Sequence, residues 1–412
     1  MHRALKEYEK IAGPPVIEQL RRLGARLQGR KVLHVNSTVE GGGVAEILSW
    51  MTPLMQDLGI DASWRVIEGS KEFFNVTKSI HNGLQGTPVG LRKRDWETYL
   101  DVNRHNAEKL RPFLEEADFA VIHDPQPAAL LQWFPKRRGK WIWRAHIDVS
   151  HPFRPVWKSL RSFVQDYDAS IFSMSQFAQL LPHPQYIITP SIDPLSEKNI
   201  DINTGELDEV RDRFGFDPKL PLLVQISRFD RFKDPLGVIK AYRMVARVKP
   251  LQLVLAGGGA SDDPEGAEVL GEVMEEAEKD PNIHVHLLPA DAHRTINALQ
   301  RLADIIIQKS TREGFGLTVT EGLWKGKPVI GGDAGGIRLQ VIDHYTGFLV
   351  NTPEGAAHRI RFLLHHKERR MQMAHTAREF VRENFLLTRH LREYLALILS
   401  LLSGEWKPVV VV

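Results

Sequence analysis

Short runs of β-branched and aromatic residues alternate along the chain with longer stretches of helical periodicity. In the first half, the strand-like runs are residues 32–35, 62–67, 119–122, 141–144, 169–172 and 186–189. Between them, segments such as 44–58 and 154–165 repeat apolar residues at helical spacing. Strands that alternate with helices predict an α/β fold whose parallel sheet is covered by helices on both faces.

The same alternation restarts after a polar segment, residues 194–206, which is the best candidate for an interdomain linker. The later strand-like runs are residues 222–226, 251–255, 283–287, 305–308, 329–330 and 347–350. A chain of 412 residues also exceeds what one hydrophobic core usually supports. We therefore predict two doubly wound, Rossmann-like domains at 1–193 and 207–388. A C-terminal helix and tail, 389–412, would pack against one domain or bridge both.

Composition excludes several classes of protein. Apolar residues make up 42% of the chain and charged residues 25%, as in ordinary globular proteins. The formal charge of +3 is small and the basic residues are dispersed, which argues against a nucleic-acid partner. Because the chain has no cysteine, disulfides, thiolate nucleophiles and Cys-ligated zinc are excluded.

The sequence gives no sign of export or of membrane insertion. The first ten residues carry charges every few positions and lack an apolar core, so they do not resemble a signal peptide. The longest apolar runs fall far short of a membrane span. We therefore expect a cytoplasmic protein with no membrane partner.

Glycines follow the first predicted strand, where doubly wound sheets collect their ligands. Residues 36–43 end in Gly41, Gly42 and Gly43, and a helix is expected from about residue 44. Glycines let the backbone approach a ligand, and a helix N-terminus offers unpaired N–H groups to an anion. A purely structural turn explains this segment equally well. Its spacing departs from the G-x-G-x-x-G of dinucleotide dehydrogenases.

Two cations follow the first strand of the second half. Arg228 and Lys233 lie in the expected strand-to-helix loop, and Pro235 suits the first turn of the next helix. Together they could hold a diphosphate and offset the charge that grows as it leaves. The alternative is a solvated loop whose cations pair with Asp230 and Asp234.

Residues 310–322 carry the densest set of chemical groups. A strand runs into a glycine-rich turn that contains Glu313, and a helix is expected to start near Leu317. Glu321 would lie about one turn into that helix, so two carboxylates could face the two ends of one ligand. Glu321 could instead merely complement the helix dipole. That alternative explains Glu313 less well, because this carboxylate stands among glycines before the helix.

Histidine and aspartate follow an N-terminal strand. His146 and Asp148 come just after residues 141–144, and in an extended chain they would point the same way. A buried histidine bonded to backbone is the commoner fate of a lone histidine, but the neighbouring aspartate favours a functional role. His123 and Asp124, after the preceding strand, form a similar but weaker pair.

With these positions identified, the chain resembles the retaining GT-B glycosyltransferases, which include sucrose synthase, glycogen synthase and trehalose phosphorylase. The likeness covers nearly the whole chain. It rests on the E-x7-E motif, here Glu313 and Glu321, and on the R-x4-K pair, here Arg228 and Lys233. Segments 31–44 and 143–150 are similar to the trehalose glycosyltransferring synthases and their phosphorylase relatives. The resemblance implies the GT-B fold, with the two domains facing across a cleft.

The resemblance also implies roles for the candidate residues. Arg228 and Lys233 would bind the donor diphosphate, Glu313 the hydroxyls of the transferred glucose, and Glu321 the ribose. Catalysis would depend on Glu313, Arg228, Lys233 and His146. The substrate-binding set would comprise Gly41, Gly42, Gly43, Asp148, Gly314, Phe315, Gly316, Leu317, Thr318 and Glu321, with backbone amides around Gly316, Leu317 and Thr318 on the distal phosphate.

The reaction implied is transfer of glucose from a nucleoside diphosphate glucose to glucose, with retention, to form trehalose. UDP-glucose and ADP-glucose are both candidate donors, because backbone groups can read any base. No tightly bound cofactor or metal is expected, with Mg²⁺ at most accompanying the nucleotide. The apolar faces of the N-terminal segment and the C-terminal helix could serve a homodimer.

Two other functions remain open at this point. A trehalose phosphorylase could use the same cations to hold glucose 1-phosphate and free phosphate, although a ribose-binding Glu321 has no use there. A non-catalytic regulator that binds sugar nucleotides would not need Glu313, Arg228, Lys233 and His146 together.

Overall fold

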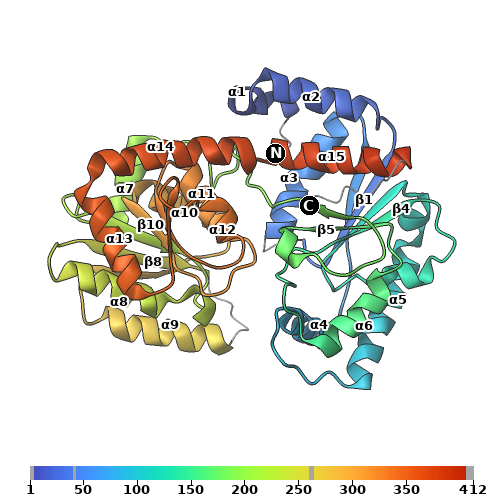
Figure 1. Cartoon of the computed structure of the whole chain (residues 1–412), viewed down its shortest axis with the longest axis horizontal. Coiled ribbons are helices and arrows are strands. Elements are labelled where there is room, and N and C mark those ends of the chain that lie inside the picture. The colour runs from blue at the N-terminus through green and yellow to red at the C-terminus, as the bar shows by residue number, and fades with distance from the viewer. Residues whose placement is uncertain (1–3, 40–42, 259–263, 405–412) are drawn as a thin grey trace. The chain divides into compact units, whose positions relative to one another are not determined.

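The computed structural model describes residues 4–39, 43–258 and 264–404. Contacts divide the chain into two compact units. Unit 1 comprises residues 1–191 and 387–412, and unit 2 comprises residues 192–386. Each unit contains one parallel sheet of six strands with helices on its faces (Figure 1). The predicted α/β architecture, with one doubly wound sheet in each half, is therefore confirmed.

The sheet of unit 1 has the strand order β2-β1-β3-β4-β5-β6. Its strands are β1 (Lys31–Asn36), β2 (Asp61–Val66), β3 (Phe119–His123), β4 (Lys140–Arg144), β5 (Ala169–Phe172) and β6 (Gln185–Ile187). The central strands are buried along almost their whole length, as expected when helices cover both faces. The order of the strands reverses between β1 and β3, which makes the carboxyl ends of these two strands the expected ligand-binding edge.

Helices of unit 1 come from both ends of the chain. They are α1 (Glu9–Ala12), α2 (Pro14–Ala25), α3 (Gly43–Asp57), α4 (Lys71–Leu84), α5 (Lys93–Glu116), α6 (Arg154–Val164) and the C-terminal α15 (Leu387–Ser403). The break between α1 and α2 falls at Gly13, where φ is +86°. Helix α15 packs against α2 and α3, so the end of the chain completes the core of the first unit (Figure 1).

The sheet of unit 2 has the strand order β12-β11-β10-β7-β8-β9. Its strands are β7 (Leu222–Ile226), β8 (Gln252–Gly257), β9 (Ile283–Leu287), β10 (Ile305–Gln308), β11 (Val329–Gly332) and β12 (Gly347–Val350). Counted from β7, this is the 3-2-1-4-5-6 order of dinucleotide-binding sheets. The order reverses between β7 and β10, so the loops that follow these two strands flank the expected binding crevice.

The helices of unit 2 cover both faces of this sheet. They are α7 (Thr204–Phe214), α8 (Pro235–Ala246), α9 (Pro264–Ala277), α10 (His293–Leu302), α11 (Leu317–Trp324), α12 (Ile337–Gln340), α13 (Pro353–His365) and α14 (Lys367–Asn384). The core between the sheet and α8, α9 and α13 is mainly aliphatic, with Val238, Ile239, Leu253, Ile305 and Ile360 all fully buried. Within the described residues, no helix combines the length and the apolar character that a membrane span requires.

Residues 194–206 do not form a free linker, although their polarity suggested one. Asn297 of α10 donates hydrogen bonds to the backbone oxygens of Glu197 and Ile200, at 2.9 and 2.8 Å. Asn199 is buried and accepts a hydrogen bond from Lys325 Nζ at 3.0 Å. Asn203 then caps α7 by accepting from the amide of Glu206 at 2.9 Å. The polar side chains of this segment are thus used for packing within unit 2.

Candidate active site

The loop after β7 is held in shape by its own polar side chains. Asp230 caps a short 3-10 helix, Arg231–Lys233, by accepting a hydrogen bond from the amide of Lys233 at 3.1 Å. Gln225, buried at the end of β7, donates from Nε2 to the carbonyl oxygen of Lys233 at 2.9 Å. The backbone of Lys233 is therefore fixed from two sides without use of its side chain.

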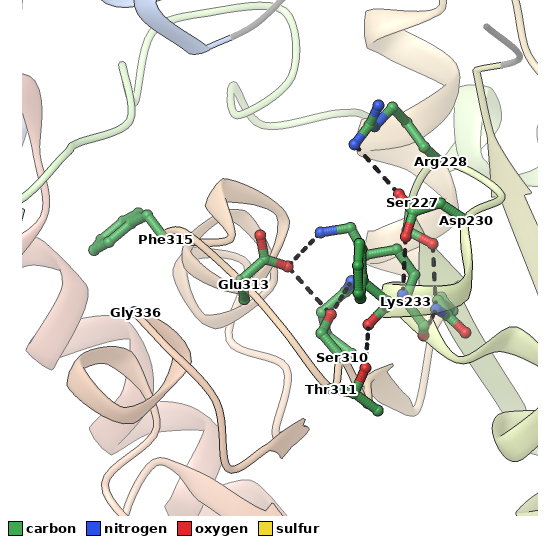
Figure 2. Close-up of polar contacts among 12 residues, drawn as sticks. Ser227, Arg228, Asp230, Lys233, Ser310, Thr311, Glu313, Phe315 and Gly336 are labelled. Carbon is green, nitrogen blue, oxygen red and sulfur yellow. Dashed lines mark hydrogen bonds and ion pairs between the residues drawn. The ribbon is translucent and has the colours of Figure 1, made fainter. Parts of the chain in front are cut away.

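Lys233 and Glu313 form an ion pair that joins the β7 and β10 loops. Lys233 Nζ lies 2.6 Å from Glu313 Oε2, and the two side chains are 15% and 10% exposed. Ser310 Oγ donates to the same carboxylate oxygen at 3.1 Å. Figure 2 shows the lysine reaching from one loop to the carboxylate on the other, with Ser310 beneath it. Lys233 and Glu313 are far apart in the sequence, and the reversal of strand order between β7 and β10 brings them together.

Arg228 lies at the same loop but in a different environment. Its side chain is 65% exposed, and its Nη2 lies 3.3 Å from Asp230 Oδ2 (Figure 2). Such an exposed ion pair contributes little to stability, so the guanidinium can reorient toward an anion at small cost. Lys233 is preorganised by its loop, whereas Arg228 is exposed beside it.

Helix α11 begins directly after a glycine. Gly316 is the N-cap residue, with φ of +85°, and no side chain among the described residues caps the helix there. The amides of Leu317 and Thr318 are the first of the helix and have no carbonyl four residues earlier in it to bond. Uncapped amides and the positive end of the helix dipole together form a site for an anion. The predicted helix start near Leu317 is confirmed.

Glu321 lies one turn inside α11 and is buried, with 3% exposure. Lys325, one turn further on, donates from Nζ to the carbonyl oxygen of Glu321 at 3.3 Å. Burial lowers the pKa of Lys325, and the charge of Glu321 opposes that shift. Glu313 and Glu321 are thus unlike: Glu313 sits in the ion pair with Lys233, whereas Glu321 sits in the helix beside a buried lysine.

A third loop, after β11, completes this edge of the sheet. The amide of Gly336 donates to the carbonyl oxygen of Gly314 at 3.1 Å, and Gln340 Nε2 donates to that of Phe315 at 2.5 Å. Gly335 has φ of +46°, and a Cβ atom built on it would lie 1.6 Å from the carbonyl oxygen of Glu313. This loop was not among the predicted site elements, although the glycine pairs at 331–332 and 335–336 were a signal of close backbone approach.

Substituting Gly335 by alanine should therefore damage unit 2 and the site together. A Cβ atom at this position would push the backbone of Glu313, and the positive φ adds strain. We expect a loss of about 2–4 kcal/mol in the free energy of unfolding, measured in urea, and a lower turnover. Gly271→Ala is the matched control. Gly271 lies within α9, and a Cβ atom added to it would meet nothing within 4 Å, so alanine should add about 0.5–1 kcal/mol there.

In unit 1 the strand that precedes His146 ends at Arg144, as predicted, but the chain that follows is not extended. Strand β4 stops at Arg144, and the chain bends at Ile147, so the alternation of an extended strand does not govern His146 and Asp148. Asp148 Oδ1 accepts hydrogen bonds from the amide and Oγ of Ser150, at 2.9 and 2.6 Å. The expectation that His146 and Asp148 point the same way relied on an extended chain, and the bend at Ile147 interrupts it.

His146 instead pairs with the residues that follow β3. Its backbone amide donates to Asp124 Oδ1 at 2.8 Å, and its Nε2 lies 2.9 Å from Nδ1 of His123. Asp124 has φ of +65°, which turns the chain sharply at the end of the strand. Burial raises the pKa of Asp124 to about 6, and the hydrogen bond from His146 and the charge of Arg144 oppose this rise. Burial lowers the pKa of His146 well below its usual value, with further lowering by Arg144 and His390.

The glycine segment after β1 is described only in part. Gly41 and Gly42 lie outside the described residues. Gly43 is the first residue of α3, so this glycine does stand at the start of a helix that follows β1.

Both halves of the chain match families of known proteins. Residues 34–179 match the family described as trehalose synthase, N-terminal domain, and residues 207–380 match glycosyl transferases group 1. A trehalose synthase of Thermococcus litoralis is 45% identical over 401 residues, which are 96% of this chain and 97% of the relative. A trehalose synthase of Rubrobacter xylanophilus is 42% identical over 412 residues, 98% of each chain.

Solved structures share the fold at low sequence identity. A sucrose-phosphate synthase from Thermosynechococcus elongatus has a TM-score of 0.70 at 15% identity, covering 91% of this chain and 100% of that one. An α,α-trehalose-phosphate synthase from Burkholderia xenovorans has a TM-score of 0.71 at 14% identity, covering 90% and 100%. These likenesses confirm the predicted GT-B fold. The identity to its curated relatives over almost the full length shows that the chain belongs to the trehalose synthase family of glycosyltransferases.

Proposed function

We propose that this protein transfers glucose from a nucleoside diphosphate glucose to free glucose, with retention of configuration, and so forms trehalose. The observation that carries the proposal is the Lys233–Glu313 ion pair, 2.6 Å long, at the reversal of strand order in unit 2. Beside it are the uncapped amides of α11 and the exposed cation of Arg228. The curated relatives that support the product, trehalose, are synthases at 42–45% identity.

Each group in unit 2 suits one part of a sugar nucleotide. Lys233 and Arg228 would neutralise the diphosphate, and the amides of Leu317 and Thr318 would receive its distal phosphate. Glu313 would accept hydrogen bonds from the hydroxyls of the transferred glucose, because its carboxylate is already oriented by Lys233 and Ser310. Glu321 would accept hydrogen bonds from the ribose.

Within unit 1, the proposed sugar-binding residues are His146, Asp148 and the glycines 41–43. His146 is held by its backbone amide and by Nε2, and its Nδ1 makes no hydrogen bond to the described residues. A neutral imidazole with one free nitrogen is suited to a sugar hydroxyl, which can both donate and accept.

The chemical step would proceed on one face of the donor sugar. The bond between the anomeric carbon and the departing phosphate oxygen breaks, and the acceptor hydroxyl attacks from the same side. Its proton passes to the departing phosphate, which Lys233 and Arg228 stabilise as its negative charge grows. Retaining hydrolases place two carboxylates about 5 Å apart and use one as a nucleophile, and this proposal needs no such nucleophile.

A donor panel tests the proposal. The protein would be incubated with UDP-, ADP- or GDP-glucose plus free glucose, and nucleotide release and disaccharide would both be measured. We expect equal amounts of nucleoside diphosphate and of a disaccharide that trehalase cleaves. Release of nucleoside diphosphate and glucose from the donor without disaccharide would contradict transfer, and the anomeric configuration read by NMR tests retention.

A phosphorylase is the second candidate, because the same cations could hold glucose 1-phosphate. A trehalose phosphorylase of Grifola frondosa is 29% identical over 86% of this chain, which spans only 54% of that relative. Incubation of trehalose with inorganic phosphate separates the two activities. Glucose 1-phosphate formed without any nucleotide would favour the phosphorylase, and its absence would favour the synthase.

A further inference from the structure

Three histidines lie side by side across the central strands of unit 1. His34 is on β1, His123 ends β3, and His146 follows β4, and these strands are neighbours in the sheet. His34 Nδ1 lies 3.0 Å from His123 Nε2, and His123 Nδ1 lies 2.9 Å from His146 Nε2. The rings therefore form a continuous hydrogen-bonded chain, from the interior at His34 to the partly exposed His146.

Burial keeps the three histidine rings uncharged. It lowers the pKa of His34 to about 3, and it lowers the pKa of His123 well below its usual value, with the neighbouring histidines and Arg144 adding to the effect. A neutral imidazole carries one proton, so each ring donates through one nitrogen and accepts through the other. Because both nitrogens of His123 are used, its tautomer determines the tautomer of the ring on either side.

The two ends of the row of three histidines differ in their surroundings. At the inner end, His34 Nε2 is buried and has no hydrogen-bond partner among the described residues. At the outer end, His146 Nδ1 is the remaining ring nitrogen of a partly exposed side chain. An apolar ring at position 34 would remove this unsatisfied atom, but it would leave His123 Nε2 without its partner. His34 therefore satisfies His123 and leaves its own Nε2 unsatisfied at the inner end.

We propose that His34 and His123 are positioning residues for the transfer reaction: they fix the ring and the tautomer of His146 so that Nδ1 carries its proton toward the sugar. This inference rests on the sugar-binding role that the proposed function gives to His146. An unpaired buried N–H is rarer in proteins than an under-used acceptor. We therefore expect His34 Nε2 to carry no proton. The protons of the three rings then lie on His34 Nδ1, His123 Nδ1 and His146 Nδ1.

The surroundings fit an orienting role better than a metal site or an acid-base relay. Arg144 is fully buried nearby and raises the cost of protonating His123 and His146, and Asp124, Tyr394 and His390 line the same interior. Among the described residues, no three His, Asp or Glu side chains are arranged to hold a metal ion. The ring contacts, with centroids 5.3 and 5.2 Å apart, hold the imidazoles in place.

A double-mutant cycle tests whether His123 acts through His146. Glucosyl transfer would be measured for His146→Ala, His123→Phe and the double variant. We expect about a 10- to 100-fold loss of kcat/KM for His146→Ala, a smaller loss for His123→Phe, and a double variant no worse than His146→Ala. Multiplying losses would overturn the proposal, because independent effects combine in that way.

His390→Phe is the matched control. His390 is fully buried in the same core, but its Nδ1 pairs with Ser191 Oγ at 3.0 Å and not with one of the three hydrogen-bonded histidines. Its effect on transfer should multiply with that of His146→Ala. A non-multiplying control would show that any damage to this core acts through His146, and would overturn the specific role of His123.

A second measurement does not depend on activity. Nitrogen-15 NMR of the histidine rings in the full chain should show His146 as the Nδ1–H tautomer, and as a mixture of tautomers in His123→Phe. A wild-type His146 in the Nε2–H form, or no change in the variant, would overturn the proposal. If His146→Ala leaves transfer unchanged while the NMR result holds, the proposed sugar-binding role of His146 fails and the hydrogen-bonded chain stands.

Discussion

Replacing Lys233 by alanine should lower kcat for glucosyl transfer by about 10²- to 10³-fold, the usual effect of removing one preorganised electrostatic contact to a developing charge. The reason is that Lys233 is fixed in place before any ligand arrives. Its backbone is held by Asp230 and Gln225, and its ammonium group lies 2.6 Å from Glu313. A cation that needs no reorganisation stabilises the departing phosphate more in the transition state than in the bound substrate, so kcat should fall more than KM rises.

The protein itself should survive this substitution. The backbone contacts of the loop do not use the lysine side chain, and Glu313 keeps its hydrogen bond from Ser310. We expect a loss of about 1–3 kcal/mol in the free energy of unfolding, because the largely buried carboxylate loses its cation but keeps the hydrogen bond from Ser310. Arg231→Ala is the matched control, because Arg231 belongs to the same short helix but pairs with Glu268 and Glu272. That variant should transfer glucose at nearly the normal rate.

Glu313→Gln separates the charge of the acid from its hydrogen bonds. Lys233 and Glu313 are in contact, so the Lys233→Ala and Glu313→Gln losses should combine to less than their product. A Lys233→Ala enzyme with near-normal kcat would remove this residue from the mechanism. The Lys233–Glu313 pair would then be a purely structural link between two loops.

Several strands and turns of unit 2 could be predicted from the sequence because they depend on residues that are near neighbours in the chain. Residues 222–226, 283–287, 305–308 and 347–350 are strands with the predicted bounds, since their apolar runs are bounded by turns. The start of α11 followed from the glycine turn, and Pro235 does open α8. Local propensity and turn chemistry determine all of these features.

Features that depend on the order of strands in the sheet could not be predicted from the sequence. The loop at Gly335 contacts Glu313 because β11 lies beside β10, and His34 meets His123 because β1 lies beside β3. Neither adjacency is encoded in a short stretch of sequence. The return of α15 to unit 1 is likewise decided by which apolar surface remains uncovered, in this case at α2 and α3. The end of β4 at Arg144 was predicted, but the bend at Ile147, which lies between His146 and Asp148, was not.

Unit 1 should lose stability as the pH falls below about 6.5, because its buried histidines are neutral when folded and take up protons when unfolded. His34, His123 and His390 are fully buried, and burial lowers the pKa of each. A depressed histidine pKa means that the unfolded state binds more protons, so stability rises with pH between the folded and unfolded values. Each such group costs about 1.4 kcal/mol per pH unit below 6.5. Asp124, with its pKa raised to about 6, acts in the opposite direction below pH 6 and offsets one histidine in part.

A single histidine can be isolated by substitution. His390→Phe removes one proton-binding site of the unfolded state, so the difference in unfolding free energy between wild type and variant should shift by about 2 kcal/mol in favour of the variant between pH 7.5 and pH 5. Arg144 and Arg389 also face this ring, and their charges add to the shift in its pKa. Urea unfolding followed by tryptophan fluorescence is a suitable measurement, because the buried Trp141 and Trp143 report on unit 1.

Leu391→Ala provides the control for this pH dependence. Leu391 is fully buried in α15 next to His390 and carries no titratable group, so its cost of about 2–5 kcal/mol should be equal at both pH values. Equal pH dependence in wild type and His390→Phe would mean that His390 is protonated in the folded protein at pH 5. That result is incompatible with a neutral, desolvated histidine cluster, since a charged ring in this core would lie beside Arg144 and Arg389 without a carboxylate to offset it among its described contacts.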